Sequence, residues 1–439
     1  MINLPLLIFV FILFAYIILS YSMKDVDFVA VSLICMFVAA FVTGLVLGVP
    51  LGFDNWFDNF VLSIEWQAII IILSMSIISK IAQDSNVLEY LAVKIFKISK
   101  GNQRYFLYLL CVITTLLAAV ISDVVVVIIL APVVVRLCHF LKIRAGTYLL
   151  GMTICINIGS IITPFSSGEN IIISTWFTLD TVFFFQYFWV FSFALLFLTI
   201  FLIDKLMLSK EPEIEAQQRE YVLELISTDV MIKNKTMFYF NSIAIVVTIT
   251  LFIVLPLLYL TAAISAVILV LVNGKYTKKP MGKILKDVEW EIIFFFISMY
   301  VVINCMLQAG FRDIIGLIPF ESFGPILTVF IILILVSLLS GFVANTPIAL
   351  IFLPIIEVLI EEFTFPAIPL LFAFIVAVNI GGNILPSGAA ADMMTLKVAK
   401  DSGVENLGFK RLLKTGATFA FIHIGISCLY LLILIPFTL

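Results

Sequence analysis

The chain has 439 residues, of which 63% are hydrophobic and 12% are charged, whereas soluble domains carry about 45–50% apolar and about 25% charged residues. This composition excludes a water-soluble globular domain, and the formal net charge of −3 comes with no basic, aromatic-rich stretch that would bind nucleic acid. The apolar residues form runs of about 17–24, the length that crosses a hydrocarbon layer ~30 Å thick as a helix. We therefore predict an all-α polytopic membrane protein, embedded in lipid, with about ten transmembrane spans.

The predicted spans begin at the start of the sequence. The first apolar run, residues 4–21, has no basic residue before it and no small-residue cleavage pattern after it, so we expect a retained span and no signal peptide. Several later runs are too long for one crossing and carry polar residues that would be costly on a straight helix facing lipid. The expected spans are 5–22, 26–48, 66–80, 105–136, 145–180, 182–203, 237–255, 257–273, 290–308, 325–356, 366–397 and 415–435.

The basic residues predict how the chain threads through the membrane. Of the 25 Lys and Arg residues, 24 fall in six segments, and Arg312 is the exception. Because cytoplasmic loops are enriched in Lys and Arg, we expect these segments inside and both termini outside, in a multi-pass protein of the plasma membrane. The segments are Lys24, Lys80–Arg104, Arg136–Arg144, Lys205–Lys235, Lys275–Lys286 and Lys397–Lys414.

Two long apolar segments are predicted to enter the membrane and return on the same side. The basic segments that flank 105–135 are both expected inside, so this segment would be a re-entrant helical hairpin with Ser122 and Asp123 at its tip. Segment 325–356 would be its counterpart entering from outside, with Asn345 and Thr346 at the tip. The alternative, one overlong tilted helix, would put the flanking basic segments on opposite sides.

The two hairpins belong to an internal repeat. Polar and structural residues recur at a fixed spacing of 222, and because one copy starts inside and the other outside, the repeat is inverted. Inverted repeats with broken helices that meet near the bilayer midplane are typical of secondary transporters. The matched pairs are Asp123/Asn345, Pro132/Pro354, Asn157/Asn379, Gly159/Gly381 and Pro164/Pro386, and Ile64-Glu65-Trp66 also matches Val288-Glu289-Trp290 at a spacing of 224.

The repeat predicts five parts of the chain. Two sets of scaffold spans alternate with two transport halves, each made of a hairpin and a broken helix, and a cytoplasmic linker joins the copies. The parts are 1–99 (first scaffold spans), 100–204 (first transport half), 205–236 (linker), 237–321 (second scaffold spans) and 322–439 (second transport half).

Each half contains one carboxylate and one amide in its polar motifs. Asp123 aligns with Asn345, and Asn170 aligns with Asp392. If tip and break meet within a half, each half offers a negative charge with amide and backbone oxygens, which suits Na⁺ or a proton. We predict Na⁺ sites at Asp123 with Asn170 and at Asn345 with Asp392, and no cofactor beyond Na⁺ or H⁺ as the coupling ion. The alternative role of both aspartates is helix capping.

The helix breaks supply further candidate ligands. Gly and Pro residues give extended backbone whose carbonyls we expect to be free for cations, and the half-helices that follow present N-terminal amides that favour an anion. The hydroxyl groups there could instead bond their own helices, and Glu169 could be a third intramembrane carboxylate or could face water. The candidates in the breaks are Asn157, Gly159, Ser160, Thr163, Ser166, Ser167, Asn170, Asn379, Gly381, Asn383, Ser387 and Asp392.

Basic residues and metal-binding patterns are missing from these motifs. With no Lys or Arg there, a multiply charged anion would depend on bound cations and helix ends. The two histidines, His139 and His423, are expected to be structural, and the six scattered cysteines show no zinc or disulfide spacing.

These motifs resemble the ion transporter superfamily over most of the chain. The nearest resemblance is to the arsenite-efflux permease and sodium/proton antiporter branch, with citrate transporters and divalent anion/sodium symporters more distant. The resemblance implies a homodimeric elevator in which the hairpins and broken helices move against a scaffold, and it implies that both tips and both breaks line the site. The motifs are Ser122-Asp123 with Pro132, Asn157-Ile-Gly-Ser-Ile-Ile-Thr-Pro164, Ala344-Asn345-Thr346-Pro347 and Asn379-Ile-Gly-Gly-Asn-Ile-Leu-Pro386.

Two departures concern the substrate. The first tip reads Ser122-Asp123 where the dicarboxylate symporters have Ser-Asn-Thr, which disfavours that substrate class. The second break ends in Asp392, where the arsenite branch has Asn, so the resemblance does not select arsenite either.

We therefore predict a secondary active transporter, not an enzyme, that moves a small anion or neutral oxyacid, arsenite-like or a carboxylate, coupled to H⁺ or Na⁺. The alternative is a Na⁺/H⁺ antiporter with no other substrate. A channel would need a charged pore ring, and an intramembrane enzyme would need a motif such as HExxH or GxSxG, and the sequence has neither.

Overall fold

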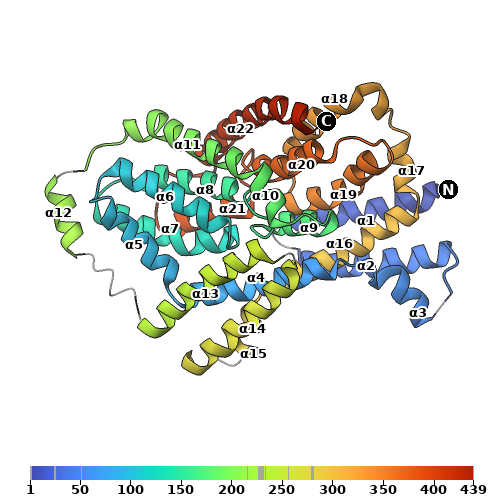
Figure 1. Ribbon diagram of the computed structural model, residues 1–439, viewed down its shortest axis with the longest axis horizontal. Helices are drawn as coiled ribbons and strands as arrows, with labels where there is room; N and C mark the ends of the chain where they lie inside the picture. The colour runs from blue at the N-terminus through green and yellow to red at the C-terminus, as the bar shows by residue number, and fades with distance from the viewer. Residues whose placement is uncertain are drawn as a thin grey trace.

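The computed structural model describes residues 2–23, 26–50, 52–214, 216–225, 232, 234–255, 257–277 and 281–438. Lys24, residues 215, 226–231 and 233 of the predicted linker, and residues 278–280 of a basic segment lie outside the described residues. Within the described ranges the chain forms helices and no strand (Figure 1), and ten of these helices are long and apolar enough to cross a membrane. The predicted all-helical membrane fold is confirmed.

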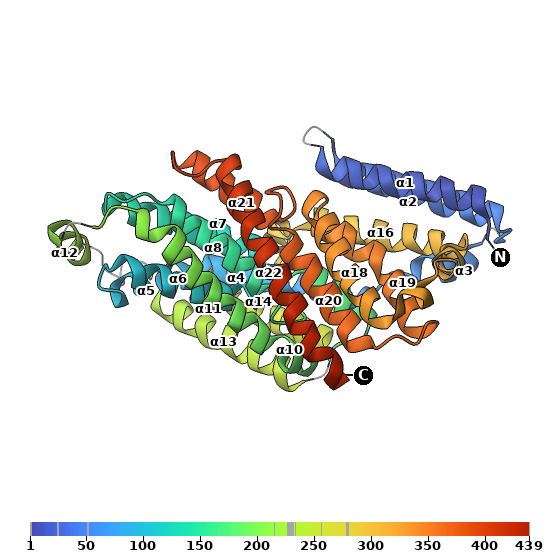
Figure 2. The ribbon, with the colours of Figure 1, turned by 90° about the horizontal axis from the view of Figure 1, so that it is seen from above.

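One set of helices, which we call the flanking group, packs mainly within itself. In this group α16 lies along α2, α14 lies along α4, and α1 covers α2 (Figure 2). Its apolar helices are rich in Ile, Val, Leu and Phe, and their outward side chains suit a lipid surface. The members are α1 (Leu4–Ser22), α2 (Phe28–Val46), α4 (Trp66–Asp84), α13 (Lys235–Val254), α14 (Leu258–Thr277) and α16 (Trp290–Gln308).

A second set, the hairpin group, contains both predicted hairpins and both broken helices. Here α6 packs along α8, α18 along α20, and α7 of the first copy along α21 of the second. The members are α6 (Gln103–Ala118), α7 (Asp123–Phe140), α8 (Gly146–Gly159), α9 (Gly168–Trp176), α11 (Trp189–Leu206), α18 (Phe320–Phe342), α19 (Asn345–Glu361), α20 (Ala367–Gly381), α21 (Ala390–Asp401) and α22 (Phe409–Thr438).

Shorter helices connect these elements. They are α3 (Phe53–Trp56), the π-helix η1 (Phe57–Val61), α5 (Val87–Ile98), α10 (Thr181–Tyr187), the 3₁₀ turn η2 (Leu208–Lys210), α12 (Ala216–Leu225), α15 (Met281–Ile284), the 3₁₀ turn η4 (Leu285–Asp287) and α17 (Phe311–Gly316).

The two copies repeat one plan of a hairpin followed by a broken helix. Helices α6 and α7 are joined at residues 119–122 and α18 and α19 at 343–344, so each predicted hairpin is two helices with a tight turn. The breaks that follow span 160–167 between α8 and α9 and 382–389 between α20 and α21. The repeat predicted from the spacing of 222 is therefore confirmed in the order of its elements, and the inversion of one copy stays a prediction.

In each copy, one glycine allows the broken helix to pack closely against its hairpin. A Cβ atom at Gly159 would lie within 3.0 Å of the Thr115 carbonyl oxygen, and one at Gly381 would lie equally close to the Ser337 carbonyl oxygen. Thr115 and Ser337 are themselves related by the spacing of 222. The same backbone contact is thus used in both copies, and any larger residue would push the two helices apart.

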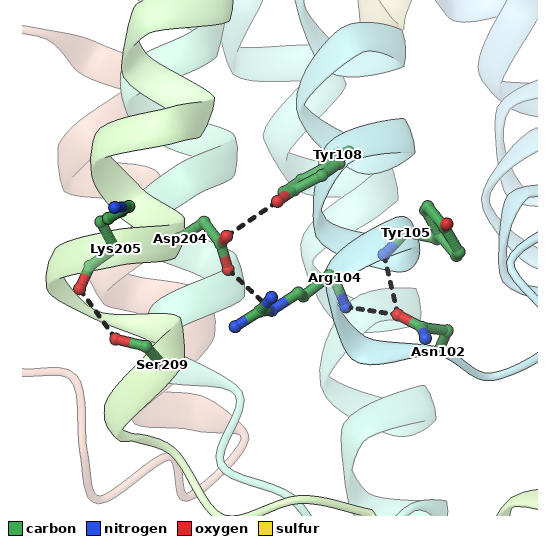
Figure 3. Close-up of polar contacts among 7 residues, drawn as sticks. All are labelled: Asn102, Arg104, Tyr105, Tyr108, Asp204, Lys205 and Ser209. Atoms are coloured by element: carbon green, nitrogen blue, oxygen red, sulfur yellow. Dashed lines mark hydrogen bonds and ion pairs between the residues drawn. The ribbon is translucent and has the colours of Figure 1, made fainter.

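A polar cluster ties α6 to α11 (Figure 3). Tyr108 donates its hydroxyl hydrogen to Asp204 Oδ2 at 2.8 Å, and Arg104 Nε lies 3.3 Å from Asp204 Oδ1. Asn102 caps the start of α6, because its Oδ1 accepts from the backbone amides of Arg104 and Tyr105 at 3.0 and 3.2 Å. The first arm of the first hairpin is thereby attached to α11, a helix that comes after the first broken helix in the chain.

The linker lies across the base of the same hairpin. Gln103 at the start of α6 donates to the carbonyl of Pro212 at 2.7 Å, and Gln218 on α12 donates to the carbonyl of Phe140 at the end of α7, at 2.6 Å. The linker therefore touches both arms of the first hairpin.

We expect Gly381→Ala to lower the thermal unfolding temperature of the purified protein, because overpacking a tight helix contact costs about 1–3 kcal/mol. Gly425→Ala is the matched control, since a Cβ there meets nothing within 4 Å. Unfolding followed by intrinsic fluorescence compares the two variants with the parent protein. Equal unfolding temperatures for both variants would show that the α18–α20 contact does not need a glycine.

Candidate substrate and ion site

A cavity of about 130 Å³ lies where the hairpin tips and the breaks face the flanking group. Both hairpin tips line it, together with the start of α9, the end of α1, the middle of α4 and the start of α16. Its polar lining consists of Ser122, Asp123, Ser166, Ser167, Glu169, Asn345 and Thr346 from the hairpin group and of Tyr21, Ser76, Ser79 and Glu289 from the flanking group.

Four helices begin at this cavity. The first residues of α7 (Asp123), α9 (Gly168), α19 (Asn345) and α21 (Ala390) all line it. A helix N-terminus carries a partial positive charge and unpaired backbone amides, so it favours a negative ligand. Because the four ends come from both copies of the repeat, the inverted arrangement concentrates this positive potential at one place.

Three carboxylates face the same cavity and none of its described lining residues is Lys, Arg or His. Asp123 lies close enough to both Glu169 and Glu289 for their charges to repel. The side chains do not converge on a single point, since no group of three His, Cys, Asp or Glu among the described residues could hold a metal ion. The cavity therefore offers a negative field for small cations beside helix ends that favour an anion.

Asp123 and Glu169 both line the cavity. Asp123 is the first residue of α7, and its Oδ1 accepts from the adjacent Val124 amide at 2.7 Å. Glu169 also lines the cavity, and its Oε1 accepts from the Thr346 hydroxyl of the other half at 3.4 Å. The N-cap position of α7 is occupied by Ser122 and has no side-chain capping bond, so helix capping by Asp123 stays a prediction, and Glu169 is a third carboxylate of the cavity lining.

Behind the cavity, buried amides join the two halves. Asn157 Nδ2 donates to Asn383 Oδ1 at 2.7 Å, and Asn379 Nδ2 donates to Asn170 Oδ1 at 2.9 Å. Each bond links one broken helix to the other, and Asn170 is fully buried. These four predicted residues do not line the cavity; they hold the two broken helices together.

Asp392 contacts the opposite half. Its Oδ1 accepts from the Thr153 hydroxyl on α8 at 2.8 Å, and the residue is 1% exposed. Asn345 stays within its own half, because its side-chain amide lies 2.7 Å from Ser340 Oγ and its backbone N–H donates to the carbonyl of Gly388 at 3.3 Å. The predicted sharing of Na⁺ by Asn345 and Asp392, and by Asp123 and Asn170, stays a prediction.

The expectation of free carbonyls in the first break needs correction. Asn170 Nδ2 donates to the carbonyls of Ser160 and Thr163 at 2.6 and 3.0 Å, and Ser166 Oγ lies within donating distance of the same two carbonyl oxygens, at 2.6 and 2.8 Å. These oxygens already have donors because buried backbone carbonyls need partners wherever they lie. In the second break Ser387 is exposed and lies outside the cavity lining.

The flanking group contributes residues that sequence reasoning missed. Tyr21, Ser76, Ser79 and Glu289 line the cavity although none was a candidate. Glu289 carried a signal, since it matches Glu65 in the repeat at a spacing of 224. This match indicates the repeat but does not by itself indicate a site.

Comparisons with known proteins place the chain in a family. A family model described as citrate transporter matches residues 10–357. A "46 kDa membrane protein" of Mycobacterium leprae is 24% identical over 84% of this chain and 86% of its own length, and a protein named an uncharacterized transporter of Mycobacterium tuberculosis is 24% identical over the same shares. A Dictyostelium discoideum relative named arsB is 27% identical over 35% of this chain and 28% of its own length.

The fold is also found among solved structures. The YdaH transporter of Alcanivorax borkumensis, reported to have an unusual topology, matches with a TM-score of 0.63 over 88% of this chain and 90% of that chain, at 10% identity. At this identity the similarity concerns the fold alone. The predicted resemblance to the ion transporter superfamily is confirmed, and the matching model within it is that of the citrate transporters. The chain therefore belongs to the citrate transporter family and is a multi-pass membrane transporter of citrate or anion type, not an enzyme.

Proposed function

We propose that the protein is a secondary active transporter that moves citrate or a similar small carboxylate together with H⁺ or Na⁺. One observation carries this proposal, namely that four helix N-termini and three carboxylates face one cavity between the two copies of the repeat. The helix ends suit the carboxylate groups of the substrate, and the acidic side chains suit the coupling ions.

The charge of the cavity requires the anion and the cations to bind together. Asp123, Glu169 and Glu289 repel a free multiply charged anion, and no basic side chain among the described lining residues opposes them. Cations that neutralise these carboxylates remove the repulsion and leave the helix ends to hold the anion. This dependence of one ligand on the other is a physical basis for coupled transport.

An elevator movement fits the two packing groups. The hairpin group would be the mobile transport domain and the flanking group the scaffold, in a homodimer of the plasma membrane with both termini outside. Packing within each group is more extensive than between them, which supports movement of one against the other. The cavity lies at the boundary between the groups, so sliding there would change the side to which it opens.

The direct test is citrate uptake into proteoliposomes driven by an imposed Na⁺ or proton gradient. We expect the parent protein to accumulate citrate, and we expect Asp123→Asn and Asp392→Asn each to reduce gradient-driven accumulation about tenfold or more, since Asp123 is a carboxylate of the cavity and Asp392 is a buried carboxylate that follows the second break. Asp54→Asn, at an exposed position on α3, is the control and should retain uptake. If both site variants keep gradient-driven uptake intact, these aspartates are not the coupling residues.

The cavity also favours a second candidate, a Na⁺/H⁺ antiporter without an organic substrate, because its charged lining residues are all acidic. An inward Na⁺ gradient imposed on vesicles without citrate should then drive protons outward, which a pH-sensitive dye inside the vesicles would report. We expect little proton movement until citrate is added. Full exchange in the absence of citrate would instead support the antiporter.

A further inference from the structure

Glu289 is a carboxylate of the flanking group that faces the proposed moving parts. It occupies the N-cap position of α16, and its backbone amide donates to Ser76 Oγ on α4 at 3.4 Å, so its position is fixed within the flanking group. Across the cavity it faces Asp123 and Glu169 of the hairpin group. These two residues would travel with an elevator movement, and Glu289 would stay behind.

The wall around Glu289 is suited to a small cation. Ser79 lines the cavity, is 1% exposed, and its hydroxyl has no hydrogen-bond partner among the described residues. The neighbouring basic residue, Lys80, is engaged elsewhere, since its Nζ lies 3.6 Å from Asp84 and 3.4 Å from Asp287. A hydroxyl and a carboxylate without a positive partner are the oxygen ligands that hard cations prefer.

The repeat places a second carboxylate at the opposite end of the flanking group. Glu65 precedes α4 as Glu289 precedes α16, and the two positions are related by the spacing of 224. The contacts follow the same symmetry, because Ser76 of α4 touches Glu289 while its counterpart at the same spacing, Tyr300 of α16, lies near Glu65. By the distribution of basic residues Glu289 lies at the cytoplasmic end and Glu65 at the outer end.

We propose that Glu289 and Glu65 are paired coupling residues, each of which raises the affinity of the site for Na⁺ in one of the two end positions of the transport domain. The proposal rests on the elevator movement proposed above. In the present structure the site adjoins Glu289, so three carboxylates attract the cation. After movement toward the outside, the same Asp123 and Glu169 would adjoin Glu65.

The physical basis is differential binding. A ligand shifts a conformational equilibrium only by the difference between its affinities for the two states. A charge on the scaffold that lies next to the site in only one end position of the transport domain contributes to cation binding in that end position alone. Removing it should weaken Na⁺ binding on one side by on the order of tenfold, within the range that is typical of coupling between sites.

The first test is Na⁺-dependent thermal stabilisation of the purified full chain, with choline chloride holding ionic strength constant. We expect Glu289→Gln to raise the Na⁺ concentration for half-maximal stabilisation by on the order of tenfold. Glu291→Gln, at a nearby exposed glutamate on the same helix, should leave it unchanged. This readout needs no citrate transport, so it stays informative if citrate is not the substrate.

The second test is sidedness in oriented proteoliposomes. Glu289→Gln should raise the half-saturating Na⁺ concentration at the cytoplasmic side only, and Glu65→Gln should raise it at the outer side only. The proposal is overturned if Na⁺ does not stabilise the parent protein, if Glu289→Gln behaves like Glu291→Gln, or if one glutamate variant changes both sides equally. Loss of citrate uptake with these Na⁺ effects intact would overturn the proposed substrate and leave the coupling residues in place.

Discussion

The backbone of a broken helix has no hydrogen-bond partner in lipid, and this constraint shapes the molecule. Each unsatisfied amide or carbonyl in hydrocarbon costs several kcal/mol, so both breaks must be buried against protein. The structure meets this need with side chains and close backbone contacts, as when Thr163 Oγ1 donates to the Ala119 carbonyl at 2.5 Å and Asn170 bonds the carbonyls around it. Gly159 and Gly381 allow the approach that makes this possible.

Burying the breaks against the hairpins has a second consequence. Because the hairpin turns and helix breaks meet at one cavity, the first residues of four helices line it. The three carboxylates on the same surface outweigh the positive potential of these helix ends, so bound cations would be needed to neutralise the excess negative charge before an anion binds. In the function that we propose, the electrostatics of the cavity would couple the binding of anion and cation, and a fixed charge of the flanking group, Glu289, would bias this coupling.

Much of this architecture could be predicted from the sequence because it depends on local patterns. Apolar runs predicted the helices, and the spacing of 222 between Asp123 and Asn345 predicted the inverted repeat, since both patterns can be seen directly in the order of residues along the chain. The side-chain partners could not be predicted in the same way. Asp392 bonds Thr153 and Asn170 bonds Asn379 across the two copies, which requires knowing how the halves interlock. Glu289 joins the site only because α16 lies beside the first hairpin tip, a long-range contact without any local signature.

The central claim is that the cavity between the hairpin tips and the flanking group holds the substrate and opens alternately to the two sides. Thr346, at the second tip, would be replaced by cysteine in a protein without its own cysteines, and its reaction with a membrane-impermeant thiol reagent would be measured from each side. The account predicts that the cysteine reacts from both sides during turnover and that citrate with Na⁺ or protons slows the reaction. Labelling that citrate and cations leave unchanged, in a variant that still transports, would contradict it.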